Sequence, residues 1–167
     1  GTEKNKETAK GYFLRACNQE HPASCFAMGL LLEENKGEKH AEAYQKGCVL
    51  NHAESCFRSG YAKEKSHPKL ALAEYVKGCN LQHAPACVNA GLLNLQSSKA
   101  PPFFARACEL GDHQGCTNLG MLYLRGNGVS QDISRAKSLL EISCRAQNPT
   151  ACDSLKNELY QLAEQAC

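Results

Sequence analysis

Apolar residues recur along the chain at the spacing of amphipathic helices, in short segments separated by turns. The first segment spans about residues 8–17 and places Phe13 and Leu14 on one helical face. The turn NQEHP breaks this pattern, and Pro22 then favours a helix start, because proline is tolerated in the first helical turn. A second segment runs from about Ala23 to Glu34, and the same succession of helix, turn and helix continues toward the C-terminus. The pattern predicts an all-α chain.

A nine-residue unit with a cysteine at each end (C-x7-C) occurs five times. Its first cysteines recur every 29 to 36 residues, a period typical of solenoids built from helix pairs. We therefore expect a disordered leader over residues 1–7, then a single α/α solenoid of about five helix pairs over residues 8–167 that ends in a capping helix. The five units are Cys17/Cys25, Cys48/Cys56, Cys79/Cys87, Cys108/Cys116 and Cys144/Cys152.

The two cysteines of each unit are placed to form a disulfide. The first ends one helix and the second lies in the first turn of the next, so a short turn brings their Cα atoms within the about 4.4–6.8 Å that the bond needs. Zinc binding is the competing interpretation, but zinc ligands usually lie two to four residues apart and no C-x2-C occurs. Each bond would close a nine-residue loop and contribute about 2.5 kcal/mol. Cysteine usage of this kind indicates an oxidising compartment.

The eleventh cysteine, Cys167, lies outside the repeated units. It is free, paired with another molecule, or separated from a partner by truncation.

A glycine follows the second cysteine by four residues in four of the five units. Glycine inside a helix costs about 1 kcal/mol against alanine, so its recurrence indicates that a neighbouring helix passes too closely for a side chain. The fifth unit has Lys156 there, which suggests a terminal helix with a solvated face. An aromatic residue or leucine precedes each first cysteine by four residues, and we expect it in the core. The glycines are Gly29, Gly60, Gly91 and Gly120, and the large residues are Phe13, Tyr44, Tyr75, Phe104 and Leu140.

The combination of A-x-x-Y-x-K/R-A/G-C, a four-residue turn, A-C-x-x-x-G-x-L and G-x-G-V-x-x-D resembles the Sel1-like repeat family. The stretch that matches best is ARACELGDHQGCTNLGMLYLRGNGVSQDISRAKSLLEISC, residues 105–144, and the resemblance covers about residues 8–160. The chain is most similar to the disulfide-stapled branch, the Helicobacter cysteine-rich proteins. The short loops NKGEK and SHPK and the lost loop near Ser98 depart from the family pattern.

This resemblance implies a TPR-like, right-handed superhelix with a disulfide inside each C-x7-C unit, and contact with another protein. It implies the periplasm or the outside of the cell, with the mitochondrial intermembrane space as an alternative. We expect a protein–protein interaction scaffold, and an immunity or inhibitor protein for a secreted effector is a special case. The alternative is a weak penicillin-binding protein or β-lactamase.

A β-lactamase would need a serine nucleophile in an S-x-x-K motif, with S-D-N and K-T-G partners. S-x-x-K occurs at Ser66/Lys69 and at Ser134/Lys137, in different repeats, whereas the two partner motifs do not occur. Helix capping explains Ser66, which lies just before a helix start. We therefore assign no catalytic residue.

Three histidines, His21, His52 and His83, each follow a first cysteine by four residues. Successive helix layers are about 8–10 Å apart, too far for one shared ion. Turn residues occupy the same position later, at Asp112 and Asn148, so a role in the turn is favoured. We expect no metal and no cofactor.

Basic residues two positions before each first cysteine have two interpretations. They form a ladder for an acidic partner, or they complement helix C-termini, and the second is favoured. These residues are Arg15, Lys46, Lys77 and Arg106.

The charge balance argues against a dedicated nucleic-acid binder. The chain has 19 basic and 17 acidic residues and a net charge of +2, without the basic excess that such proteins concentrate on one face. No apolar run approaches the length of a membrane span, and the polar start shows no signal peptide, which leaves the compartment open. We expect a protein partner on polar residues that flank the glycine face. They are Arg58, Asn89, Asn94, Asn118, Tyr123 and Arg125.

Overall fold

The chain divides into two compact units, residues 1–86 and residues 87–167, and each is described by itself. The computed structural model describes residues 2–34 and 39–165, without the side chains of residues 2–4 and 158–165. All regular structure in these residues is α-helical, which confirms the predicted fold class.

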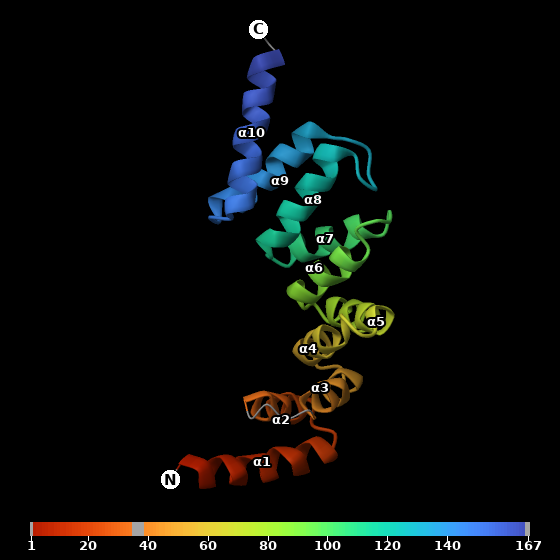
Figure 1. Cartoon of the computed structure of the whole chain (residues 1–167), viewed down its shortest axis with the longest axis vertical. Coiled ribbons are helices and arrows are strands. Elements are labelled where there is room, and N and C mark those ends of the chain that lie inside the picture. The colour runs from red at the N-terminus through yellow and green to blue at the C-terminus, as the bar shows by residue number, and fades with distance from the viewer. Residues whose placement is uncertain (1, 35–38, 166–167) are drawn as a thin grey trace. The chain divides into compact units, whose positions relative to one another are not determined.

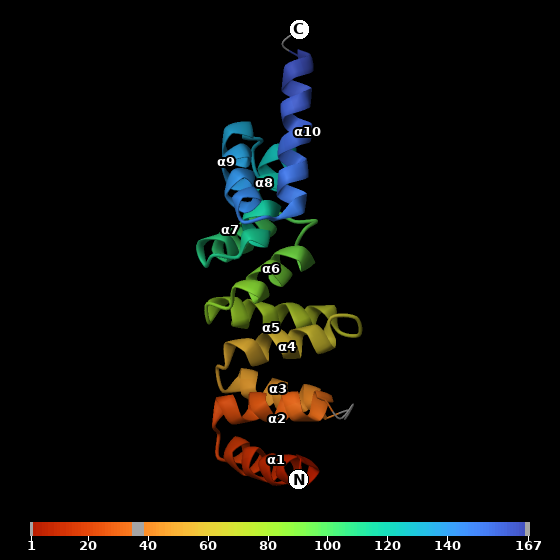
Figure 2. The same ribbon diagram turned by 90° about the vertical axis from the view of Figure 1, so that its left-hand side faces the viewer.

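Both units are built from antiparallel helix pairs in which each helix packs against the next one in the chain (Figures 1 and 2). The first unit contains α1 (Thr2–Asn18), α2 (Pro22–Glu34), α3 (His40–Val49), α4 (Ala53–Lys63) and α5 (Pro68–Asn80). The second contains α7 (Ala100–Glu109), α8 (His113–Arg125), α9 (Ile133–Arg145) and α10 (Pro149–Gln165). The boundary falls within α6 (Ala84–Leu93).

Helix α1 begins at Thr2, upstream of the expected start near Thr8. The added turns are polar, and Lys6 Nζ lies 3.0 Å from the Glu34 carboxylate at the end of α2. Apolar periodicity reports only the buried part of a helix, so the sequence pattern did not reveal these turns.

The turn inside each helix pair has one conformation. In the second pair Asn51 has φ of 65°, the Asn51 N–H donates to Cys48 O at 2.9 Å, and the His52 N–H donates to Gly47 O at 2.9 Å. These are the two bonds of the Schellman motif, which ends a helix on a left-handed residue. The positive-φ residues at this position are Glu20, Asn51, Gln82, Gly111 and Gln147.

The disulfides join the helices just before and after these turns. Cα–Cα distances are 4.6 Å for Cys17–Cys25, 4.4 Å for Cys48–Cys56, 4.6 Å for Cys108–Cys116 and 4.7 Å for Cys144–Cys152. Cys79 and Cys87 are disulfide-bonded as well. The C-x7-C disulfides are therefore confirmed, while Cys167 lies outside the described residues.

Small residues beside the disulfides allow the helices to approach this closely. A Cβ atom added to Gly47 would clash with the Ser55 side chain, and one added to Gly115 would lie 2.5 Å from Ala107 Cβ. One side of each of these crossings therefore has to be a glycine.

The recurrent mid-helix glycines accept the large residue of the next helix. A Cβ atom on Gly60 would lie 2.8 Å from the ring of Tyr75, and one on Gly91 would lie 2.5 Å from the ring of Phe104. Both rings are fully buried. The predicted close approach is confirmed, and its partner is a buried side chain. Gly29 and Gly120 receive Tyr44 and Leu140 in the same way.

Candidate interaction surface

A chain of charged and polar side chains connects the second helices of the first unit. The Tyr44 hydroxyl donates to Glu33 Oε2 at 2.6 Å, and Arg58 Nη1 lies 3.5 Å from the same oxygen. Arg58 Nε donates to Glu54 Oε1 at 3.2 Å. Glu54 Oε2 in turn lies 2.6 Å from His83 Nε2. Arg58 is therefore held between two carboxylates.

Two histidines of this unit, His52 and His83, cap helices. His83 Nδ1 accepts the Ala86 N–H at 3.3 Å, so the ring proton lies on Nε2 and is donated to Glu54. His52 Nδ1 accepts the Ser55 N–H at 3.2 Å. This agrees with the favoured turn role, because a side-chain acceptor satisfies an unpaired N–H of the first helical turn.

The network shifts the protonation of its members. Burial raises the pKa of Tyr44 far above its ordinary value, and the hydrogen bond to Glu33 adds to this. Burial opposes ionisation of Glu54, but hydrogen bonds from His83 and Arg58 outweigh it and lower the pKa of Glu54. Burial also lowers the pKa of His52.

The second unit has a relay of amides at the equivalent positions. The Ala151 N–H donates to Asn148 Oδ1 at 3.1 Å, and Asn148 Nδ2 donates to Gln114 Oε1 at 3.3 Å. Gln114 Nε2 then donates to Asn118 Oδ1 at 3.0 Å. By their spacing from the cysteines, Asn148, Gln114 and Asn118 correspond to His83, Glu54 and Arg58.

The relay of amides ends without an acceptor. Asn118 Nδ2 is buried and has no hydrogen-bond partner among the described residues. In the first unit Arg58 finds Glu33, eight residues after Cys25, whereas the residue eight positions after Cys87 is Leu95. A leucine offers no acceptor, so the Asn118 N–H stays unsatisfied.

A hollow lies beside each relay. The hollow of the first unit has a volume of about 300 Å³, and that of the second has a volume of about 210 Å³. Residues two, five, six and nine positions after the second cysteine line both, so the repeat builds the same hollow twice. They are Arg58, Tyr61, Ala62 and Lys65 in the first unit and Asn118, Met121, Leu122 and Arg125 in the second.

A third, wider hollow of about 610 Å³ lies among α7, α8 and α9. Arg135 stacks on the Tyr123 ring at 5.0 Å, and apolar side chains such as Leu119 and Ile142 share the lining with Glu109.

The predicted binding residues are distributed over these hollows. Asn118 and Arg125 line one hollow, Tyr123 lines the wide one, and Arg58 lines the hollow of the first unit. Asn94 Nδ2 donates to Ala90 O at 2.9 Å within its own helical segment. Asn89 is half-buried on α6. Their binding role stays a prediction.

Two of the four basic residues of the first helices contact the preceding repeat, whereas Arg15 and Arg106 bind groups of their own helices. Lys46 Nζ donates to Asn18 Oδ1 at 3.1 Å, at the end of α1, and Lys77 Nζ donates to Val49 O at 3.1 Å, at the end of α3. These contacts support the favoured interpretation, in which cations complement helix C-termini.

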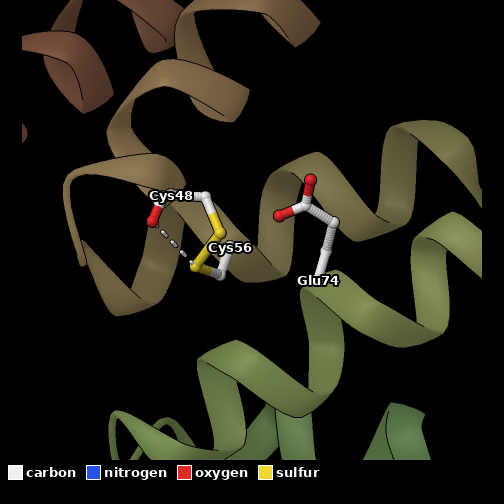
Figure 3. A group of neighbouring side chains, drawn as sticks. All are labelled: Cys48, Cys56 and Glu74. Carbon is white, nitrogen blue, oxygen red and sulfur yellow. Dashed lines mark hydrogen bonds between the residues drawn. A yellow bond between two sulfur atoms is a disulfide. The ribbon is translucent and has the colours of Figure 1, made fainter.

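One side-chain cluster in the described residues resembles a metal site in composition. Cys48, Cys56 and Glu74 lie close together, and Figure 3 shows the two sulfur atoms joined in a disulfide beside the carboxylate. A disulfide sulfur is not the thiolate that binds metals. Glu74 is instead paired with Lys63 at 2.8 Å.

The serines of the two S-x-x-K motifs lie at or just before the starts of helices. Ser66 Oγ lies 2.9 Å from His67 Nδ1, and the N-cap position of α5 is His67, not Ser66. The expectation that Ser66 caps this helix is therefore wrong, because Pro68 sets the first helical residue. Ser134 lies at the start of α9 in the wide hollow.

Among the described residues, no helix combines the length and the apolar character that a membrane crossing requires.

The fold and the disulfides define a class of protein, a helical-repeat protein whose helix pairs are held by C-x7-C disulfides. The model of the Sel1 repeat matches residues 1–21 and 113–148. The chain is thus a disulfide-rich helical-repeat protein that is similar to the Sel1 repeat in these residues. No curated protein sequence matches it.

Two of the solved structures that resemble this chain share its fold. One is a protective antigen present in uropathogenic Escherichia coli strains and displaying an SLR fold, with a TM-score of 0.80 and 21% identity over 91% of this chain and 36% of that chain. Another is a Sel1 repeat protein from Oxalobacter formigenes, with a TM-score of 0.73 and 23% identity over 89% of this chain and 66% of that chain. The chain therefore spans about a third and about two thirds of their lengths. Helicobacter pylori cysteine rich protein B is 26% identical over 93% of this chain and 98% of that chain, with a TM-score of 0.35.

Proposed function

We propose that this protein is an exported scaffold that binds another protein through the hollows beside its second helices. The observation that carries this proposal is the recurrence of one hollow at the same repeat positions in both units. A surface that a repeat builds more than once suits an elongated partner, as in other repeat proteins. The Sel1 repeats support this role, since such repeats generally mediate protein interactions.

The disulfides support export. Bonds of this kind persist in oxidising compartments and are rare in the cytosol. The periplasm or the outside of the cell is the location that we propose, and the mitochondrial intermembrane space is the alternative. Alkylation of free thiols in intact native cells, followed by mass spectrometry, tests this. We expect the ten cysteines of the five units to escape alkylation until a reductant is added.

Affinity capture from an extract of the native envelope, with the oxidised protein as bait, tests the scaffold role. We expect one stoichiometric protein partner, whose capture Arg58→Ala and Tyr123→Ala both weaken. Arg145→Ala is the matched control, because Arg145 is exposed and its one ion pair among the described residues is with Glu141 of its own helix. A partner captured equally by all variants would remove these hollows from the interface.

Neutralisation of a secreted effector is a special case of this role. It predicts that a captured toxin is inhibited at a one-to-one ratio. Absence of any partner, together with covalent labelling of one serine by a penicillin, would contradict the scaffold role and support β-lactam binding.

A further inference from the structure

The hollow of the second unit combines an unsatisfied donor, an apolar lining and a cation. Its donor is the buried Nδ2 of Asn118. The lining includes Leu92 and Leu95, which are 48% and 42% exposed although they are large apolar residues. Arg125 lies at its edge, is exposed, and forms no ion pair with any residue that the structure describes.

The orientation of the Asn118 amide is fixed from outside the hollow. A backbone N–H can only donate, so the Ala151 N–H requires the oxygen of the Asn148 amide to face it. The Asn148 NH2 group then faces the oxygen of Gln114. The Gln114 NH2 group in turn donates to Asn118 Oδ1. Rotating the Asn118 amide would place two donors face to face. The relay therefore keeps Asn118 Nδ2 turned away from Gln114 and provides no acceptor for it.

In the first unit the equivalent acceptor is part of the chain itself. There Glu33 supplies the oxygen to Arg58 and also accepts the Tyr44 hydroxyl. At the equivalent positions the second unit has Leu95 and Phe104, both without polar atoms. The polar partner that the repeat supplies in one unit is thus missing from the other, and the space beside it is open.

The size and spacing of the site define the ligand. A volume of about 210 Å³ takes one apolar side chain, since a cavity of about 150 Å³ holds benzene. Asn118 and Arg125 are seven positions apart on α8, which is about 10 Å at 1.5 Å per residue. One carboxylate does not reach both. An extended chain advances about 3.3 Å per residue, so two groups that are about three residues apart in an extended peptide reach Asn118 and Arg125 together.

We propose that this hollow binds an extended segment of a partner protein that carries an apolar residue and, two to four positions away, an acidic residue. The apolar side chain fills the space between Leu92, Leu95 and Met121. A backbone carbonyl beside it accepts the Asn118 N–H, and the acidic side chain pairs with Arg125. This inference rests on the proposed scaffold function and names the chemistry of its partner.

Synthetic peptides test the proposal on the full oxidised chain. The probes are acetylated and amidated heptapeptides with one leucine and one glutamate, one to five positions apart in a glycine–serine background, and binding is followed by amide chemical shifts in NMR. We expect the tightest binding at spacings of two to four, with shifts centred on residues 92–95 and 118–127. Replacing the glutamate by glutamine should weaken binding about fivefold, as expected for one exposed ion pair.

Two variants separate this site from unspecific binding. Leu95→Glu supplies an internal acceptor and a repelling charge, so it should weaken binding more than tenfold; Leu95 is exposed, and circular dichroism verifies the fold. Arg125→Gln should abolish the difference between glutamate and glutamine peptides. Arg145→Gln removes an exposed charge elsewhere and should change nothing.

The proposal is wrong if no probe binds at millimolar concentration, if the spacing has no influence, or if Leu95→Glu binds as the unmodified chain does. A captured partner that is retained fully by Leu95→Glu would leave the scaffold function intact and overturn this inference alone. Peptide binding at the hollow without any captured partner would support the peptide site and contradict the scaffold function.

Discussion

The two units fill equivalent repeat positions with different chemistry. In residues 1–86 the position beside the recurrent glycine holds Tyr44, whose hydroxyl shares Glu33 with Arg58. In residues 87–167 the same positions hold Phe104, Leu95 and Asn118, and the buried Asn118 N–H has no partner among the residues that the structure describes. The comparison shows that one repeat geometry satisfies its polar groups internally in the first unit and leaves a donor unsatisfied among the described residues in the second.

The residues that cap the helices also differ between the two units. In the first unit the capping rings of His52 and His83 pack on Phe26 and Phe57, with ring centroids 4.9 and 5.1 Å apart. In the second unit Asp112 accepts the Gln114 N–H at 2.9 Å through a short carboxylate. The capping groups of the first unit are therefore imidazole rings packed on phenylalanine side chains, whereas Asp112 caps with a carboxylate.

The largest expected effect concerns the disulfides, which the two units protect to different degrees. Cys48 and Cys56 are 1% and 0% exposed, whereas Cys144 and Cys152 are both partly exposed. Replacing either pair by alanine should lower the free energy of unfolding by about 2.5 kcal/mol, the value for a nine-residue loop. Denaturant unfolding of the two double variants measures this.

The same difference predicts an order of reduction. Dithiothreitol should reduce Cys144–Cys152 before Cys48–Cys56, because the attacking thiolate needs access to a sulfur atom. Timed alkylation and mass spectrometry of the unmodified chain detect this order. Simultaneous reduction of both bonds would mean that burial does not distinguish the units.

The next largest effect concerns the contact between glycine and ring. Gly60→Ala places a methyl group against Tyr75 and should cost about 1–3 kcal/mol, as for an overpacked core. Gly11→Ala is the control, because a Cβ atom there meets nothing within 4 Å. That variant should gain up to about 1 kcal/mol from helix propensity alone. Thermal unfolding of both should shift in opposite directions, and equal shifts would refute the packing argument.

Replacing residues of the first unit by their equivalents in the second should lower the free energy of unfolding by a smaller amount, and a second replacement should restore part of it. Glu33→Leu leaves the Tyr44 hydroxyl and one side of Arg58 unpaired, at a cost of about 1–2 kcal/mol. Adding Tyr44→Phe removes the stranded hydroxyl and reproduces the Leu95–Phe104 arrangement, so part of the stability should return. A double-mutant cycle measures the coupling. Strictly additive losses would show that Glu33 and Tyr44 do not act together.

The smallest effect is a dependence of the stability of the first unit on pH. The pKa values of His52 and Glu54 are both lowered by folding, so the unfolded chain binds protons more readily. Stability should therefore be full above about pH 6.5 and decline below it through His52, then further below about pH 4.5 through Glu54. The relay of Asn148, Gln114 and Asn118 has no titratable member.

Hydrogen exchange at several pH values, corrected for the intrinsic rate, resolves the two units. His52→Asn keeps a capping acceptor, as Asn148 does, and should remove the decline near pH 6. An equal decline in both units would contradict the assignment to these residues.

Much of the fold is readable from the cysteine spacing alone. C-x7-C with a short turn predicts antiparallel helix pairs and their disulfides, because few other geometries bring both Cα atoms within bonding range. The glycine after each second cysteine predicts a close approach. The ring that fills it was not predictable as its partner, since this depends on how adjacent helices pack.

The site was predictable only in part. Sequence alignment of the second cysteines makes Arg58 and Asn118 equivalent, which marks a repeated surface position. The unsatisfied N–H depends on a relay through Gln114 and Asn148 and on Leu95 of another helix pair. Such a network joins residues that are far apart in the chain, and no local pattern reports it.

The recurrent left-handed turn also bears on how the oxidised protein is made. Each disulfide joins residues only eight positions apart, and the entropy lost on closing a loop rises with its length. Pairing within a unit is therefore favoured over pairing between units while the chain is still unfolded. In the oxidising compartment that we propose, an oxidase that meets the emerging chain would find the correct partner of each cysteine only eight positions away. We expect the native bonds to form in order from the N-terminus, without a disulfide isomerase.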